Sequence, residues 1–284
     1  MQKNENKPAN TPKHLGQHLR YSNKFVGRIK EKDDIRQLLQ QHDSLVVVNG
    51  MGGIGKTSIA YNLMQEDQNA YQHLIWTNLE IPSYGRKEML KNTLLYQSRP
   101  LHLHLGIAEK LQTAKDTAEK WEILWHRISM LQGKVLWVMD NVRADDVATI
   151  KSLPKTCTFL LTSRQELNGI ETYKLDELKA DDALKLFKTY YKGKNEDDIL
   201  AQICQTVHFH ALSIELLARN LAAIDDMTAQ QFLEKLQESL LHHQPQAEVY
   251  TAYTQKKMDM YSVLTFAFRL GDMYHIKELH PLLH

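Results

Sequence analysis

The residues with the clearest chemical pattern are Gly50, Gly55, Lys56 and Thr57, which fit the spacing G-x-x-x-x-G-K-[ST] without a gap. Glycines let successive backbone N–H groups turn inward toward an anion, where a side chain would block the approach. The lysine would reach the outer phosphates of a nucleoside triphosphate as a point charge, and the threonine hydroxyl would bind Mg²⁺. The pattern therefore predicts a loop that binds a nucleoside triphosphate and Mg²⁺.

The elements on either side of this loop have the pattern that the motif requires. The β-branched run at residues 46–48 predicts a buried strand before the loop. Residues 59–64 place their apolar side chains at helical spacing, so the loop leads into a helix whose positive N-terminal end faces the same anion. A glycine-rich turn without a ligand is the alternative. The complete motif in its strand–loop–helix context favours the phosphate site.

Two later strand patterns end in polar residues. Residues 135–141, VLWVMDN, form an apolar run that ends in Asp140, and residues 156–164, TCTFLLTSR, end in Arg164. Ligands of open α/β sheets lie beyond the carboxyl ends of the strands. Asp140 would therefore orient Mg²⁺, and Arg164 would contact the γ-phosphate. The alternative for Arg164 is a surface arginine at a strand end.

The order of the patterns predicts the fold. Strand patterns at residues 73–78 and 172–175 complete a set that alternates with helical patterns, among them residues 105–131, so we expect a parallel sheet in a three-layer α/β/α arrangement. From residue 180 only helical spacing follows, with Asp181 or Thr228 as possible N-caps, which predicts a small all-helical subdomain. The predicted parts are a disordered tail or linker at 1–22, a nucleotide-binding α/β domain at 23–176, a helical lid subdomain at 177–243 and an incomplete winged-helix-like segment at 244–284.

Composition limits the classes of partner. The 284 residues carry a formal net charge of +1, so nothing in the overall charge indicates a nucleic acid or an anionic membrane surface. Cys157 and Cys204 lie in apolar-periodic stretches, as expected for buried thiols in a reducing compartment. The sequence shows no signal-peptide pattern and no apolar run of about 18 residues, the length a membrane span needs. We expect a cytoplasmic protein.

Three weaker patterns leave alternatives open. Residues 25–28, FVGR, could line an adenine pocket or simply start a helix after a glycine turn, and the residues alone favour the helix start. His102 and His104 could share one face and bind a metal, although a surface or half-buried position is the commoner role. The lysines among residues 185–194 could contact nucleic acid, but adjacent acidic residues cancel most of their charge.

In combination, the motifs resemble a known family. FVGR at 25–28, GMGGIGKTSIA at 50–60, VMDN at 138–141, LLTSR at 160–164, LDELKADDALKLF at 175–187 and HALSIELLA at 210–218 occur in an order and spacing similar to the NB-ARC ATPase module. That module belongs to the signal-transducing STAND NTPases, which include plant and bacterial NLR-type receptors and the apoptosome scaffold. The resemblance covers about residues 23–240. It implies a site for ATP or ADP with Mg²⁺.

The resemblance also implies a role for each matching residue. Val26 and Arg28 match the segment that contacts adenine and ribose. Asp140 matches the acid on the Mg²⁺ side, and Arg164 matches the arginine that reads the γ-phosphate. The expected nucleotide-binding residues are Val26, Gly27, Arg28, Gly50, Gly52, Gly53, Ile54, Gly55, Lys56, Thr57, Ser58, His210 and Ala211. The expected catalytic residues are Lys56, Asp140 and Arg164, and the expected Mg²⁺ ligands are Thr57 and Asp140.

The chain departs from the family pattern at several positions. Asn141 stands where the family often has a second acid, and an amide can orient a water molecule but cannot take its proton. We therefore expect at most slow, Mg²⁺-dependent ATP hydrolysis. Ala211 stands where proline is usual, and His208 and His210 replace glycines, so the floor of the adenine pocket should differ. For His210, a role as a core or helix-start histidine stays equally open.

The resemblance implies a signalling switch. Bound ADP would hold the α/β and helical parts closed, and exchange for ATP would drive opening and self-association. A separate effector or sensor protein is a further expected partner, whereas membrane and nucleic acid are not. ATP is favoured over GTP because no N-K-x-D motif follows the Asp140 strand. Two alternatives are a DNA-associated ATPase of the AAA+ or initiator type and a truncated nucleotide-binding remnant that no longer switches.

Overall fold

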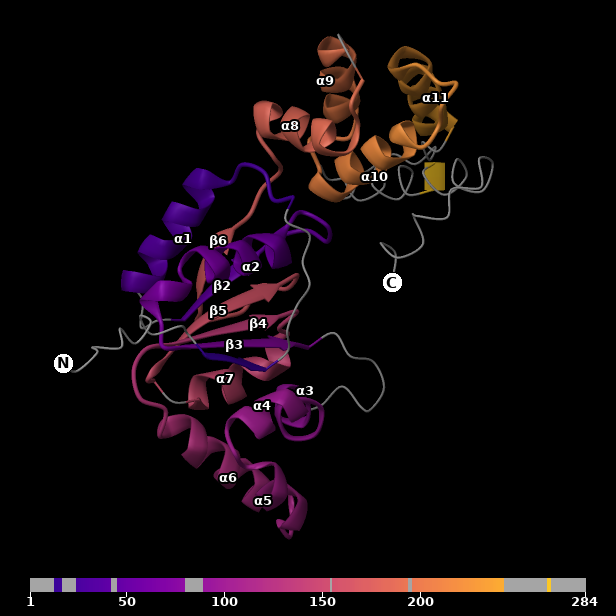
Figure 1. Cartoon of the computed structure of the whole chain (residues 1–284). Helices are drawn as coiled ribbons and strands as arrows, with labels where there is room; N and C mark the ends of the chain where they lie inside the picture. The colour runs from indigo at the N-terminus through magenta and orange to yellow at the C-terminus, as the bar shows by residue number, and fades with distance from the viewer. Residues whose placement is uncertain are drawn as a thin grey trace, which may run out of the picture. The chain divides into compact units, whose positions relative to one another are not determined.

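The computed structural model describes residues 13–16, 24–41, 45–79, 89–153, 155–193, 196–242 and 265–266, and these form two compact units (Figure 1). The α/β unit takes its described residues from Met1–Ser22, Ile29–Gly52 and Lys56–Leu175. The helical unit takes its own from Asn23–Arg28, Gly53–Gly55 and Asp176–His284. The division after Leu175 lies next to the domain boundary that we expected near residue 176.

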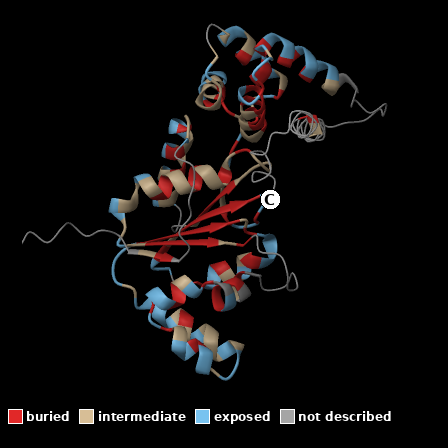
Figure 2. Ribbon diagram, turned by 45° about the vertical axis from the view of Figure 1, so that its right-hand side comes forward, coloured by how far each residue is buried: buried red, intermediate tan, exposed pale blue. Residues whose placement is uncertain are grey.

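The α/β unit is built on a sheet of six parallel strands in the order β1-β3-β4-β5-β2-β6. The strands are β1 (Lys13–Gly16), β2 (Leu45–Asn49), β3 (His73–Asn78), β4 (Val135–Asp140), β5 (Cys157–Ser163) and β6 (Glu171–Lys174). Strand β4 is buried along its full length, and β2 and β3 are buried between their end residues (Figure 2). Continuous apolar runs are typical of parallel strands that are covered on both faces.

Helices cover both faces of this sheet. They are α1 (Ile29–Gln41), α2 (Lys56–Glu66), α3 (Met89–Asn92), α4 (Arg99–His104), α5 (Ala108–Thr113), α6 (Thr117–Ser129) and α7 (Val147–Ser152), with short turns η1 (Gln68–Ala70), η2 (Thr93–Gln97) and η3 (Ala144–Asp146). Figure 1 shows α1 and α2 on one face of the sheet and α3–α7 on the other. The predicted α/β/α fold with a parallel sheet is therefore confirmed.

One local expectation was wrong for residues 13–16. Strand β1 lies inside residues 1–22, which we expected to be a disordered tail or linker, and it pairs with the edge of β3 while Leu15 joins the core. Four residues are too few to show a period in the sequence, whereas an open strand edge offers unpaired N–H and C=O groups. The helical pattern at 105–131 corresponds to two helices, α5 and α6, because the side chain of Asp116 accepts a hydrogen bond from Glu119 N–H and starts a new helix.

The helical unit contains α8 (Ala180–Tyr190), α9 (Asp197–Thr206), α10 (Ala211–Ala222) and α11 (Ala229–His242). Thr228 caps α11 as expected, because its hydroxyl accepts from Gln231 N–H at 3.2 Å while Gln231 Oε1 accepts from Thr228 N–H at 3.0 Å. Asp181 instead lies within the first turn of α8. The core includes residues from all four helices and Phe266, whose ring lies 5.6 Å from that of Phe232.

The remaining expectations for residues 244–284, apart from Thr265 and Phe266, lie outside the described residues. Within the described part of the chain, no helix is both long enough and apolar enough to cross a membrane. Cys157 on β5 and Cys204 on α9 are buried as expected. Burial raises the pKa of the Cys157 thiol to about 11 and that of the Cys204 thiol to about 12.

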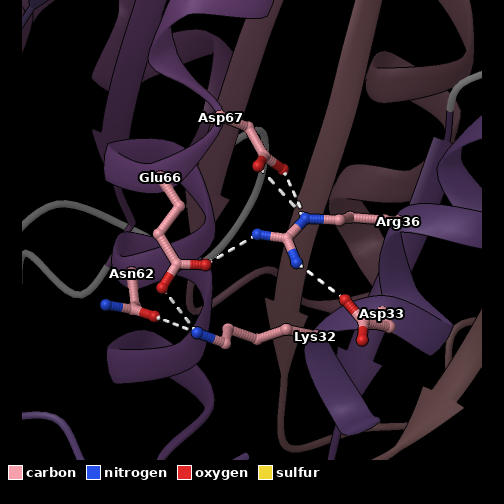
Figure 3. Close-up of polar contacts among 6 residues, drawn as sticks. All are labelled: Lys32, Asp33, Arg36, Asn62, Glu66 and Asp67. Carbon is pink, nitrogen blue, oxygen red and sulfur yellow. Dashed lines mark hydrogen bonds and ion pairs between the residues drawn. The ribbon is translucent and has the colours of Figure 1, made fainter. Parts of the chain in front are cut away.

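A charge network joins α1 to the C-terminal end of α2 (Figure 3). Glu66 is its centre, because its carboxylate lies 2.6 Å from Lys32 Nζ and 2.7 Å from a terminal nitrogen of Arg36. Arg36 also reaches Asp67 and Asp33, each at 2.9 Å, and Asn62 accepts from Lys32 at 2.9 Å. Since α2 begins at Lys56, this network helps to fix the helix that carries the lysine predicted to bind phosphate.

Replacing Glu66 by glutamine tests how much this network contributes. Burial alone would raise the pKa of Glu66, but the hydrogen bonds and charges of Lys32 and Arg36 hold it below its ordinary value of 4.5. We expect E66Q to lower the free energy of unfolding near neutral pH by about 1 kcal/mol or less, since the side chain is 41% exposed and partly screened. The loss should be present above pH 4.5. It should disappear as the pH falls through the lower folded-state pKa, because the wild-type carboxyl is then protonated and uncharged, as the glutamine side chain is at every pH.

Urea denaturation, followed by circular dichroism, measures the free energy of unfolding near neutral pH and again at a pH below the folded-state pKa of Glu66. The matched control is E166Q, because Glu166 lies 3.8 Å from Lys174 in a pair whose side chains are 77% and 72% exposed. We expect no change in E166Q at either pH. An equal effect of the two substitutions would show that the α1–α2 network adds nothing beyond an ordinary surface ion pair.

Candidate functional site

The loop between β2 and α2 has the backbone that its glycines allow. Gly53 and Gly55 have positive φ angles of 75° and 106°, which residues other than glycine rarely adopt. A Cβ atom at Gly55 would meet nothing within 4 Å, so the conformation alone explains that glycine. At Gly53, a Cβ atom would lie 2.9 Å from His210 and from Leu212, so this position also lacks space.

Lys56 is the first residue of α2 and is buried. Its ammonium donates hydrogen bonds to the carbonyl oxygens of Gly50 at 2.9 Å and Met51 at 2.8 Å. Burial and the positive charge of Arg164 lower the pKa of Lys56 to about 8, while Asp140 opposes the shift. An anion beside Lys56 and Arg164 would favour the charged lysine, so the electrostatics of this position suit a phosphate.

Thr57 and Asp140 lie in contact. The hydroxyl of Thr57 donates to Oδ1 of Asp140 at 2.9 Å, and Asp140 is buried at the carboxyl end of β4. A carboxylate and a hydroxyl oxygen are ligands that Mg²⁺ accepts, with water and substrate phosphates completing its octahedral shell. The residues present therefore fit the expected Mg²⁺ ion. When bound, the ion would neutralise negative charge on the outer phosphates.

Arg164 lies beside the first half of the loop. A Cβ atom built at Gly52 would be 3.6 Å from the guanidinium carbon of Arg164, so an alanine there would touch it. The α/β unit thus brings Gly50, Gly52, Lys56, Thr57, Asp140 and Arg164 to one region at the carboxyl edge of its sheet. Ser58 follows in the first turn of α2 and is half-buried.

Asn141 occupies the position of the expected second acid. Its φ is 63°, its side-chain amide donates to Oδ1 of Asn78 at 3.2 Å, and its N–H donates to the hydroxyl of Thr162 at 3.0 Å. Sequence reasoning missed Asn78 and Thr162. Both lie at the carboxyl ends of strands that flank β4, and this placement was the available signal.

In the helical unit, Arg28 connects three backbone segments. Its φ is 60°, it is buried, and its guanidinium donates to the carbonyl oxygens of Ile54 and Glu177, each at 3.2 Å. Gly27 has a φ of 69°, and a Cβ atom there would overlap the carboxylate of Asp182. Val26 packs against the helical core. The segment at 24–28 is therefore tied to the middle of the loop and to the start of α8.

His210 has the helix-start role that we left open. Its Nδ1 accepts from Ser213 N–H at 3.3 Å and lies 3.0 Å from the Ser213 hydroxyl, so His210 caps α10, of which Ala211 is the first residue. Leu212 N–H donates to the carbonyl oxygen of Gly53 at 3.1 Å. His208 has a φ of 51°, a conformation that favours the glycine usual there. Contact of His210 and Ala211 with a ligand stays a prediction.

His102 and two of the lysines among residues 185–194 make ordinary structural contacts. His102 is buried and its Nε2 lies 2.5 Å from the carbonyl oxygen of Leu94, and the described residues include no group of three or more His, Cys, Asp or Glu that could hold a metal ion. Lys185 lies 3.3 Å from Asp182, and Lys188 lies 2.7 Å from Asp197. These pairs reduce the basic charge that nucleic acid would need.

Comparison with known proteins identifies a family whose matched region includes the glycine loop. The NB-ARC domain family matches residues 26–197. The disease resistance protein RGA2 of Solanum bulbocastanum is 29% identical in an alignment of length 194 that covers 60% of this chain and 18% of that protein. The transcription activator GutR of Bacillus subtilis (strain 168) is 25% identical in an alignment of length 166 that covers 55% of this chain and 19% of that protein. The chain thus spans less than a fifth of these relatives.

A solved structure shares the fold. The Walker-type ATPase paby2304 of Pyrococcus abyssi aligns with a TM-score of 0.51 over 77% of this chain and 73% of that chain. The sequences are 10% identical in this alignment, so the likeness concerns the fold alone.

The lowered pKa of Lys56 predicts pH-dependent binding of ADP. In the free protein the lysine loses its proton near pH 8, whereas a bound phosphate would hold the proton. ADP affinity should therefore fall as the pH rises through 8, by up to about tenfold per pH unit, with uptake of up to about one proton on binding. Calorimetric titration in two buffers of different ionisation enthalpy counts these protons. The control K174A, at an exposed lysine, should behave as the wild type does. Binding without proton uptake at about pH 9 would show that Lys56 keeps its proton without a ligand.

Gly27 and Gly106 form a matched pair for testing the packing of the 24–28 segment. Their φ angles are 69° and 68°, but a Cβ atom at Gly106 would meet nothing within 4 Å, whereas one at Gly27 would overlap Asp182. Both alanine substitutions carry the left-handed strain of about 1 kcal/mol. We expect G27A to lose a further ~1–3 kcal/mol of unfolding free energy through overpacking, measured by urea denaturation. Equal losses would show that Asp182 moves aside freely.

Proposed function

Since the chain belongs to the NB-ARC family, whose match covers more than half of its residues, we propose that it is an ATP- and ADP-binding switch of a signalling protein. The observation that carries the proposal is the grouping of Lys56, Thr57, Asp140 and Arg164 at one edge of the sheet. A phosphate-binding lysine, a Mg²⁺-binding hydroxyl and acid, and an arginine near the loop are the parts that recognise a polyphosphate.

Each residue has a distinct role in this proposal. Lys56 binds the β- and γ-phosphates, and the N–H groups of the glycine loop surround them. Thr57 and Asp140 hold Mg²⁺, either directly or through water. Arg164 distinguishes ATP from ADP, because only ATP has a γ-phosphate for its guanidinium to bind. Val26, Gly27, Arg28, His210 and Ala211 are proposed to lie on the adenine and ribose side.

Contacts within the helical unit support this last assignment. Arg28 holds the carbonyl oxygen of Ile54, and Leu212 N–H holds that of Gly53, so both bonds fix loop residues that the helical unit contains. The loop therefore contains residues of both units: Gly53–Gly55 belong to the helical unit, and the residues on either side of them belong to the α/β unit. A change in loop conformation when the γ-phosphate binds is our proposed origin of the switch.

The switch can use only the difference in affinity of its two states for the two nucleotides. Asn141 favours a long-lived ATP state, since its amide cannot accept a proton from an attacking water. We propose that ATP binding leads to self-association and to contact with a separate effector or sensor protein in the cytoplasm. One relative is named as a disease resistance protein and the other as a transcription activator. These names support a regulatory role for this chain too.

Identification of the retained nucleotide tests the proposal. The wild-type protein should carry ADP after purification, which extraction and anion-exchange chromatography measure. K56A should bind ADP about 100-fold more weakly and retain little, because a buried charged hydrogen-bond partner is lost. K174A, at an exposed lysine of the same unit, should retain ADP as the wild type does. Bound GDP or GTP, or a wild type that neither retains nor binds ADP, would overturn the assignment.

A further inference from the structure

Hydrogen bonds connect the ends of β4 and β5 beyond their regular pairing. The paired residues of the two strands run from Val135 opposite Cys157 to Met139 opposite Leu161. Past this point, Val142 N–H donates to the carbonyl oxygen of Thr162 at 2.8 Å, and the Ser163 hydroxyl donates to the carbonyl oxygen of Val142 at 2.7 Å. The end of β4 is therefore held against the end of β5.

The side chain of Thr162 is the central part of this connection. Its hydroxyl oxygen accepts a hydrogen bond from Asn141 N–H at 3.0 Å, and the hydroxyl also bonds to Oδ1 of Asp140. An N–H group can only donate, so the single hydroxyl proton of Thr162 is directed to the Asp140 carboxylate. The orientation of the hydroxyl thus follows from its two partners.

Two hydroxyls fix the Asp140 carboxylate from different elements. Thr57 on α2 and Thr162 on β5 both donate to Oδ1 of Asp140. Thr57 is itself a proposed Mg²⁺ ligand, whereas Thr162 would affect the ion through Asp140. Since a carboxylate rotates easily about its side-chain bonds, a second donor on a buried strand limits the positions that Asp140 can take.

The burial of Thr162 indicates that its hydroxyl is present for the hydrogen bonds with Asp140 and Asn141. Thr162 is 0% exposed and follows the apolar residues 159–161 of β5, and valine would have nearly the same shape at this position. A buried hydroxyl is unfavourable unless its hydrogen bonds are made. The bond to Asn141 N–H also supports the left-handed conformation of Asn141, which follows Asp140 directly.

We propose that Thr162 is a positioning residue that orients Asp140 for Mg²⁺ and thereby sets the Mg²⁺ dependence of nucleotide binding. The inference rests on the proposed nucleotide-binding function. It gives the end of β5 two roles, because Thr162 holds the acid and Arg164, which follows the strand, is proposed to bind the γ-phosphate. A partner of this kind typically changes metal affinity about 10–100-fold when it is removed.

Comparison of T162V and T162S isolates the hydroxyl. The probe is a fluorescent ADP analogue, titrated with protein in the presence of a chelator and then at increasing Mg²⁺ concentrations. We expect T162V to need about 10–100-fold more Mg²⁺ for the half-maximal gain in affinity, while its affinity with the chelator stays within about threefold of the wild type. T162S keeps the hydroxyl and should restore the Mg²⁺ response.

The matched control is T77V. Thr77 is a buried threonine on β3 whose hydroxyl accepts from the Trp137 indole at 3.0 Å, so this change also removes a buried hydroxyl from the sheet. We expect T77V to change stability without changing the Mg²⁺ midpoint. An equal shift in T77V and T162V would attribute the effect to loss of sheet stability and overturn the proposal.

Further outcomes separate this inference from the proposed function. A wild type with Mg²⁺-dependent affinity and a T162V variant with the same Mg²⁺ midpoint would overturn the role of Thr162 alone. A wild type that binds no ADP analogue would overturn the proposed function and this inference with it. Should T162V not fold, T162A and T162S allow the same comparison, and equal Mg²⁺ midpoints in these two variants would overturn the proposal.

Discussion

The burial of a positive charge at the start of α2 is the constraint on which the α/β unit depends. Lys56 is enclosed, bonded to two backbone carbonyl oxygens and close enough to Arg164 for its pKa to be lowered. Such a group costs folding free energy in the absence of a ligand. The sheet and the loop hold it in place nonetheless, and a bound anion would reduce this cost by favouring the charged lysine.

Around this charge, much of the arrangement follows from strand order. Strand β5 lies between β2 and β4, so the carboxyl ends of three strands bring the loop, Arg164 and Asp140 to one edge. Polar side chains then replace the regular ladder, with Thr162 holding Asp140 and Asn78 holding Asn141. In the helical unit, hydrogen bonds also fix loop residues: Arg28 donates to the carbonyl oxygen of Ile54, and Leu212 N–H donates to that of Gly53.

The sequence was informative where the chemistry is local. The glycine loop, the apolar runs that end in Asp140 and Arg164, and the change to helices near residue 176 all have short-range patterns, and the parallel α/β fold followed from them. The partners of Asp140 and Asn141 could not be read in this way, because Thr162 lies 22 residues after Asp140 and many apolar strands contain a threonine. Strand β1 was missed because KHLG has no period.

The two cysteines of the chain are divided between the units, with Cys157 in the α/β unit and Cys204 in the helical unit. Each thiol is buried and has a raised pKa, so at neutral pH it is protonated and shielded from alkylating reagents. Exposure of either sulfur requires its own unit to open locally or to unfold. The protein therefore carries one built-in chemical reporter for each unit, and the alkylation rate at each site follows the opening of that unit without any introduced label.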